Sequence, residues 1–208
     1  MSQLIENLIN NRVLKTERII RAFKKIKRID FLQDNLKFLA ELDKPLPIGC
    51  GQTISQPSVV AFMLELLSPK QGEKVLDIGS GSGWTTALLA EIVSQNNEQG
   101  RVFSIEIIPE ILKFGKKNTE KYNFVKKGIV EFVCADGAKG YPDQANFDKI
   151  LVSASAQKIP LSLKQQLKIN GKLVCPVKNS IFLIEKDKEK SFKEVEYPGF
   201  IFVPLVHT

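Results

Sequence analysis

The sequence predicts one α/β domain over residues 1–208, built on a doubly wound, mostly parallel β-sheet. Three observations predict this fold class. From residue 73 onward, short apolar runs typical of buried strands alternate with segments typical of helices. A glycine-rich turn joins the first of these runs to the helix after it. The last apolar runs follow one another without a helix, which predicts an antiparallel hairpin at the C-terminal edge of the sheet.

The first 44 residues predict a helical extension that covers one edge of the core. Over residues 2–43, apolar side chains recur at helical spacing in two groups, Leu4, Ile5, Leu8 and Ile9, then Ile19, Ile20, Phe23 and Ile26. Prolines and glycines then predict a loop over residues 45–58. A helix follows from Pro57 to about Leu67, because proline suits the first helical turn.

The core, residues 73–208, contains the remaining predicted elements. Strands are predicted over residues 74–78, 102–105, 129–134, 148–152 and 172–177. Helices are predicted over residues 84–93, 109–122 and 161–167. The final hairpin is predicted to pair residues 181–184 with residues 200–203.

Composition excludes several classes of protein. The formal net charge is +7, but the basic residues are spread over segments that resemble solvated helix faces, so we do not expect a nucleic-acid partner. No apolar run is long enough for a membrane span, and the first residues lack a secretory signal, so we expect a cytoplasmic protein.

The cysteines and the histidine also limit the chemistry. Cys50, Cys134 and Cys175 are odd in number and far apart, which argues against a disulfide framework. His207 is the single histidine, so we expect neither a metal site nor a histidine-based hydrolase.

The glycine-rich turn is the most informative segment. It follows a predicted strand, opens a helix, and bears glycines at every second position, namely Gly79, Gly81 and Gly83. A dinucleotide site would need a glycine at the position of Trp84. The spacing resembles motif I of class I S-adenosylmethionine-dependent methyltransferases. This resemblance predicts S-adenosylmethionine as cofactor, S-adenosylhomocysteine as product, and cofactor contacts at Asp77, Gly79, Ser80, Gly81 and Gly83.

Two acidic residues follow the next strands. Glu106 ends the second strand, where a carboxylate can accept hydrogen bonds from both hydroxyls of a ribose. Asp136 and Gly137 follow the third strand, and in the methyltransferase resemblance that acid contacts the adenine amino group. We therefore add Glu106, its neighbour Ile107, Asp136 and Gly137 to the candidate cofactor site.

The segment from Pro47 to Pro57 narrows the family. It reads PIGCGQTISQP and resembles the signature loop of the protein-L-isoaspartate O-methyltransferases. The likeness continues through Ile159-Pro160 and Gly171 to Val174, and reaches the segment FVPL at residues 202–205. It implies a monomer that methylates the α-carboxylate of isoaspartyl residues in damaged proteins.

The resemblance also implies roles for individual residues. Ser55 hydrogen-bonds the attacking carboxylate, and Thr53 and Ile54 shape the wall between substrate and cofactor. The implied substrate contacts are Ile48, Thr53, Ser55, Val203 and Pro204. Because a carboxylate with a pKa of about 3.5 is ionised at neutral pH, its methylation needs no general base.

Two alternatives stay open at this point. The chain could be a methyltransferase with another acceptor, RNA or a different carboxylate, or a cofactor-binding adaptor without turnover. Departures from the family pattern at Ser58, at residues 153–157 and at residues 178–182 motivate both. Methyl transfer to an isoaspartyl peptide would distinguish the isoaspartyl methyltransferase from both alternatives.

Overall fold

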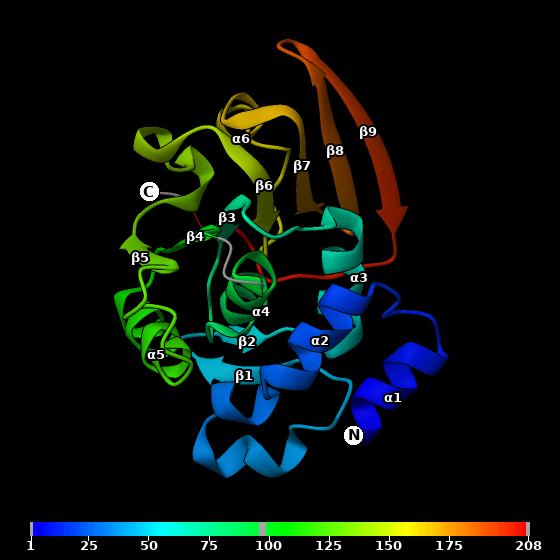
Figure 1. Cartoon of the computed structure of the whole chain (residues 1–208), viewed down its shortest axis with the longest axis vertical. Helices are drawn as coiled ribbons and strands as arrows, with labels where there is room; N and C mark the ends of the chain where they lie inside the picture. The colour runs from blue at the N-terminus through cyan, green and yellow to red at the C-terminus, as the bar shows by residue number, and fades with distance from the viewer. Residues whose placement is uncertain (1, 96–98, 207–208) are drawn as a thin grey trace.

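The computed structural model describes residues 2–95 and 99–206. Its main feature is a seven-stranded sheet of order β5-β4-β3-β6-β7-β8-β9 (Figure 1). Five strands pair in parallel and the last two antiparallel, which confirms the predicted fold class. The strands are β3 (Lys74–Ile78), β4 (Arg101–Glu106), β5 (Val130–Cys134), β6 (Phe147–Val152), β7 (Leu167–Val177), β8 (Ser180–Lys188) and β9 (Ser191–Pro198).

The strand order predicts a ligand crevice at the carboxyl ends of the central strands of this sheet. The chain runs outward from β3 through β4 to β5 and then returns to form β6 on the other side of β3. In such open parallel sheets, ligands bind outside the carboxyl ends of the strands at the point where the order reverses. The turns that follow β3, β4 and β6 are therefore expected to line a ligand-binding site.

Both faces of the sheet are covered. Along β3, Val75 enters one apolar cluster while Leu76 and Ile78 enter another, as expected for the alternation of a strand. The helices α3 (Pro57–Leu67), α4 (Trp84–Val93) and α5 (Pro109–Glu120) pack on the first face. The short helix α6 (Leu161–Gln165) contributes Leu163 to the cluster on the second face.

The N-terminal extension is helical but discontinuous. It comprises α1 (Gln3–Asn10), α2 (Glu17–Lys25) and two 3-10 turns, η1 (Arg28–Phe31) and η2 (Asp34–Leu39). The helical conformation is interrupted after α1, where Arg12 has a φ of 56°. It is then held by Glu65 of α3, whose carboxylate accepts hydrogen bonds from the backbone N–H groups of Lys15 and Thr16 at 2.8 Å. The region predicted as helical over residues 2–43 is therefore divided into shorter helices, and the carboxylate of Glu65 binds the backbone between the first two.

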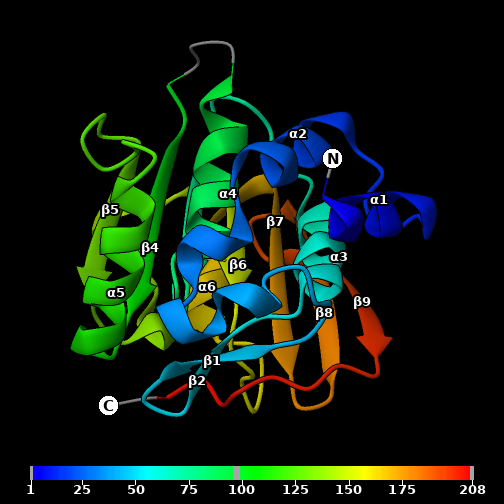
Figure 2. The same cartoon turned by 90° about the horizontal axis from the view of Figure 1, so that it is seen from below.

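The segment predicted as a loop over residues 45–58 contains a small antiparallel hairpin of β1 (Leu46–Gly49) and β2 (Gln52–Ile54). Its turn residues Gly49, Cys50 and Gly51 all have positive φ values, of 103°, 50° and 69°. The hairpin lies beside the carboxyl ends of the parallel strands (Figure 2).

The strand predicted over residues 200–203 is wrong. The second strand of the C-terminal hairpin is β9, residues 191–198, whose mixture of Lys, Glu and apolar residues lies mostly exposed at the sheet edge. Residues 199–206, which we call the C-terminal strap, leave the sheet and run back along the strand ends (Figure 2). Part of the apolar strap packs there: Phe200 stacks on Phe62 with ring centroids 5.2 Å apart, whereas Ile201 is 89% exposed.

Within residues 2–95 and 99–206, no helix is long and apolar enough to cross a membrane.

Candidate active site

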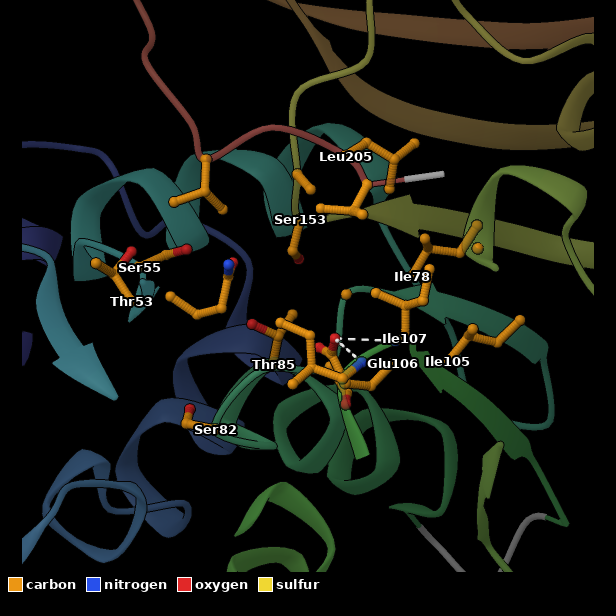
Figure 3. A pocket seen from close by; sticks show the side chains of 18 of the residues that line it. Thr53, Ser55, Ile78, Ser82, Thr85, Ile105, Glu106, Ile107, Ser153 and Leu205 are labelled. Carbon is orange, nitrogen blue, oxygen red and sulfur yellow. Dashed lines mark hydrogen bonds between the residues drawn. The ribbon is translucent and has the colours of Figure 1, made fainter. Parts of the chain in front are cut away.

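A cleft lies at the carboxyl ends of β3, β4 and β6, between the β1–β2 hairpin and the C-terminal strap (Figure 3). It encloses about 710 Å³ of unfilled space, open mouth included. Candidate residues that line it are Thr53, Ile54, Ser55, Gly79, Ser80, Glu106, Ile107, Gly137, Val203 and Pro204. Ile48, Asp77, Gly81, Gly83 and Asp136 do not line it.

The glycine turn forms the floor of the cleft. Gly79, Gly81 and Gly83 have φ values of 79°, 51° and 84°, a region that disfavours every residue with a Cβ. Only Gly79 of the three contacts the cleft. A Cβ at Gly81 would lie 3.5 Å from Ile48 Cδ1, so Ile48, which is buried, supports the turn from behind. Gly81 and Gly83 therefore set the path of the turn without lining the cleft.

Of the three glycines in the turn, Gly83 has the least space for a side chain. A Cβ there would lie 2.4 Å from the backbone oxygen of Gly115 and 2.6 Å from Thr119 Oγ1, where α5 crosses the start of α4. We expect Gly83→Ala to destabilise the protein by about 3 kcal/mol or more, from the strained φ and the overlap together. Gly128→Ala is a matched control, since Gly128 has a φ of 69° and nothing within 4 Å. Urea unfolding of both variants measures the difference; equal losses would contradict the packing argument.

Glu106 is held by the backbone around it. Its Oε1 accepts hydrogen bonds from the N–H groups of Ile107 at 2.9 Å and Ile108 at 3.1 Å, and its Oε2 accepts one from Gly81 at 3.1 Å (Figure 3). A carboxylate has about four acceptor sites, so this one retains capacity for a further donor. The isoleucines Ile78, Ile105, Ile107 and Ile108 form apolar walls near it.

Asp136 and Gly137 occupy the loop after β5. Asp136 Oδ1 accepts a hydrogen bond from the N–H of Ala138 at 2.9 Å and caps a short 3-10 turn. A Cβ at Gly137 would come within 2.3 Å of Ile78 Cγ2, so glycine lets this loop approach the cleft wall closely. The contact of Asp136 with an adenine stays a prediction.

Asp77 lies under the cleft rather than in it. Its side chain is fully buried, and Oδ2 accepts a hydrogen bond from Thr86 Oγ1 at 2.6 Å. Oδ1 has no partner among the described residues. Burial is the main cause that raises the pKa of Asp77 to about 7, against the opposing effect of the hydroxyls of Thr86 and Ser104 nearby.

This shift predicts an unusual pH dependence. An acid whose pKa rises on folding stabilises the fold most below its unfolded value, 3.8, and that stability is lost as pH rises to about 7. We expect the free energy of unfolding of the wild type, relative to Asp77→Asn, to fall by a few kcal/mol across this window and to stay flat above it. Urea unfolding between pH 4 and 8, with Asp143→Asn as an exposed control, measures it. A difference that is constant with pH would contradict the assignment.

A second cavity adjoins the first. It measures about 740 Å³ with its open side and is lined by Pro45, Gln56, Val59, Ile201, Phe202 and four residues that also line the cleft. These four shared residues, which we call the junction, are Thr53, Ser55, Ser153 and Val203. A ligand in the cleft and a chain lying in the second cavity would therefore meet at Ser55.

The backbone at Ser55 is anchored from behind by Arg28. The buried guanidinium donates hydrogen bonds to the carbonyl oxygens of Lys44 at 2.7 Å, Leu42 at 2.9 Å and Ser55 at 3.4 Å. Burial lowers the pKa of Arg28 to about 10, so the group stays charged at neutral pH. The hydroxyl of Ser55 has no hydrogen-bond partner among the described residues and is free to bind a ligand.

Sequence reasoning missed part of the lining. The positions Ile78, Ile105 and Ile108 adjoin predicted ones and could have been found as neighbours at strand ends. The strap residues Leu205 and Val206, and Ser153, gave no such signal, since they meet the other residues of the cleft only in the fold. The full set missed is Gln52, Ile78, Ser82, Thr85, Ile105, Ile108, Ser153, Ala154, Leu205 and Val206. His207 lies outside the described residues, and within those no cluster of three potential metal ligands occurs.

A parallel sheet that reverses beside β3, a glycine turn after β3 and a carboxylate after β4 define the class of α/β proteins that bind a nucleotide-type cofactor at the strand ends. The family model of protein-L-isoaspartate(D-aspartate) O-methyltransferase matches residues 1–208. The chain belongs to that family.

Relatives agree with this assignment, and a solved structure agrees with the fold. The chain is 40% identical to a protein-L-isoaspartate O-methyltransferase of Methanopyrus kandleri, over 98% of this chain and 90% of the relative. It is 42% identical to that of Pyrococcus horikoshii, over 97% and 90%. A Plasmodium falciparum structure, described as a proposed protein-L-isoaspartate O-methyltransferase with S-adenosyl-L-homocysteine, matches in fold at a TM-score of 0.87 and 24% identity, over 99% of this chain and 97% of that one.

Proposed function

We propose that this protein transfers a methyl group from S-adenosylmethionine to the α-carboxylate of isoaspartyl residues in damaged proteins. The observation that carries the proposal is the junction: the cleft at the strand ends opens beside a second cavity, and the Ser55 hydroxyl stands where they meet. Membership of the family supports the choice of acceptor.

The residues of the cleft fit S-adenosylmethionine. Glu106 retains acceptor capacity for a ribose hydroxyl, and the neighbouring isoleucines suit the faces of an adenine. Ser80 Oγ is buried at the cleft without a partner among the described residues, as expected of a group that bonds a ligand. When bound, the cofactor supplies a methyl group on a sulfonium.

The protein's part in the reaction is mainly positioning. The acceptor carboxylate is already ionised, so no residue has to remove a proton. Ser55 donates a hydrogen bond that holds the carboxylate in line with the methyl group, and Thr53 and Ile54 bound its approach. The strap covers the junction with Val203 and Pro204, which excludes water from the reacting atoms.

Repair then needs no further residue of this chain. In the methyl ester, the backbone nitrogen that follows attacks the ester carbonyl, its proton and methoxide leave as methanol, and a succinimide forms. Water reopens the ring to aspartate or isoaspartate.

The test is transfer of labelled methyl from S-adenosylmethionine to a synthetic isoaspartyl peptide, beside the matching aspartyl peptide. We expect label on the isoaspartyl peptide alone. Cofactor binding without transfer to that peptide would overturn the proposal and favour another acceptor, RNA or a different carboxylate, or an adaptor without turnover. The net charge of +7 is the only observation in favour of RNA.

Two finer predictions accompany this function. We propose that the protein acts in the cytoplasm, in keeping with three unpaired cysteines, of which Cys50 and Cys134 are exposed. We also propose that it acts as a monomer, which light scattering during size-exclusion chromatography would measure.

A further inference from the structure

Ser153 is the junction residue that the reaction described above leaves without a role. It follows β6, and its backbone N–H donates a hydrogen bond to the carbonyl of Ile78 at 2.8 Å. Its Cβ lies 3.8 Å from the place a Cβ of Gly79 would take, so it stands directly over the glycine turn. The end of β6 and the glycine turn together fix the position of the Ser153 Cβ.

The hydroxyl of Ser153 is not used by the fold. It has no hydrogen-bond partner among residues 2–95 and 99–206, although the residue is half-buried. Ser155, two positions on, contrasts with it: its hydroxyl donates to the carbonyl of Lys178 at 3.0 Å and lines neither cavity. The hydroxyl at Ser153 is therefore available to a ligand, whereas that at Ser155 is structural.

Three hydroxyl-bearing residues thus reach the junction, from two directions. Thr53 and Ser55 approach from the β1–β2 hairpin, and Ser153 points into the cleft from the end of β6 (Figure 3). A carboxylate acceptor has two oxygens, of which one attacks. A single donor leaves the group free to rotate, whereas donors to both oxygens fix its plane and therefore the direction of the attacking lone pair.

We propose that Ser153 donates a hydrogen bond to the carboxylate oxygen that does not attack, while Ser55 holds the group from the hairpin side. The acceptor is thereby specified as a carboxylate held at both oxygens. This role rests on the proposed function and adds to it a second substrate-binding hydroxyl.

The test compares Ser153→Ala with the wild type, using Ser155→Ala as neighbouring control and Ser153→Thr as the variant that keeps a hydroxyl. We expect Ser153→Ala to lower kcat/KM for an isoaspartyl peptide about ten- to hundredfold, the worth of a hydrogen bond to a charged group. Ser155→Ala should stay within about threefold, and Ser153→Thr should recover most of the loss. Calorimetric affinity for S-adenosylhomocysteine should be unchanged in all three.

Peptide binding gives a second readout. The affinity of the isoaspartyl peptide for the complex with S-adenosylhomocysteine should also fall in Ser153→Ala. The inference fails if Ser153→Ala matches Ser155→Ala in kcat/KM, or if it loses cofactor affinity as strongly as turnover. An inactive wild type that still binds the cofactor overturns the proposed function itself, which no result on Ser153 alone would do.

Discussion

Ser55→Ala should reduce kcat for an isoaspartyl peptide about hundredfold, because loss of the donor lets the acceptor oxygen leave the line of transfer. The affinity for S-adenosylhomocysteine should stay within about threefold, since the carboxylate at Glu106 and the glycine turn are unchanged. Single-turnover methyl transfer measures the chemical step, and calorimetry measures the binding. The expected signature is therefore a large loss of turnover at nearly constant cofactor affinity.

A neighbouring hydroxyl supplies the control. Ser58 lies in the first turn of α3, outside both cavities, and its N–H donates to Asp43 Oδ1 at 2.8 Å. Ser58→Ala should leave kcat nearly unchanged. Equal losses in the two variants, or a loss of cofactor affinity in Ser55→Ala that matches its loss of turnover, would count against the role of Ser55.

The parts of the site that follow regular strands were predictable from the sequence. Gly79, Ser80 and Glu106 come directly after apolar runs, and carboxyl ends of adjacent parallel strands meet at one edge of a sheet. Local patterns sufficed because these residues are positioned by the elements they adjoin. Asp77 and Gly83 show the limit of that reasoning, because Asp77 lies in β3 and Gly83 in the glycine turn, yet neither lines the cleft.

The other part of the site depends on contacts between distant segments. Residues 200–203 have the apolar pattern of a strand, but their backbone pairs with single loop residues: the N–H of Ser155 donates to the carbonyl of Val203 at 2.8 Å. An apolar run reports that a segment is covered and does not report what covers it. Val203 and Pro204 of the strap were predicted through the family resemblance alone, and the hydroxyl of Ser153 became part of the site only in three dimensions.

Glu106→Gln should weaken binding of S-adenosylhomocysteine at least about hundredfold, while the fold remains. The carboxylate accepts three backbone N–H groups, so an amide in its place turns one acceptor into a donor that faces a donor. A hydrogen bond from a ribose hydroxyl would also lose its charged acceptor, at about 1.5–3 kcal/mol. Calorimetric titration measures the affinity.

The control for this change is Glu110→Gln, an exposed glutamate in the first turn of α5. It removes the same charge close by in the sequence, and we expect affinity within about threefold of the wild type. If both variants lose affinity for S-adenosylhomocysteine equally, the loss comes from the change in net charge near the site. If only Glu106→Gln loses it, the loss requires the oriented carboxylate. Because the same N–H groups that hold Glu106 belong to the glycine turn and to the start of α5, binding at this carboxylate is coupled to the turn that shapes the cleft.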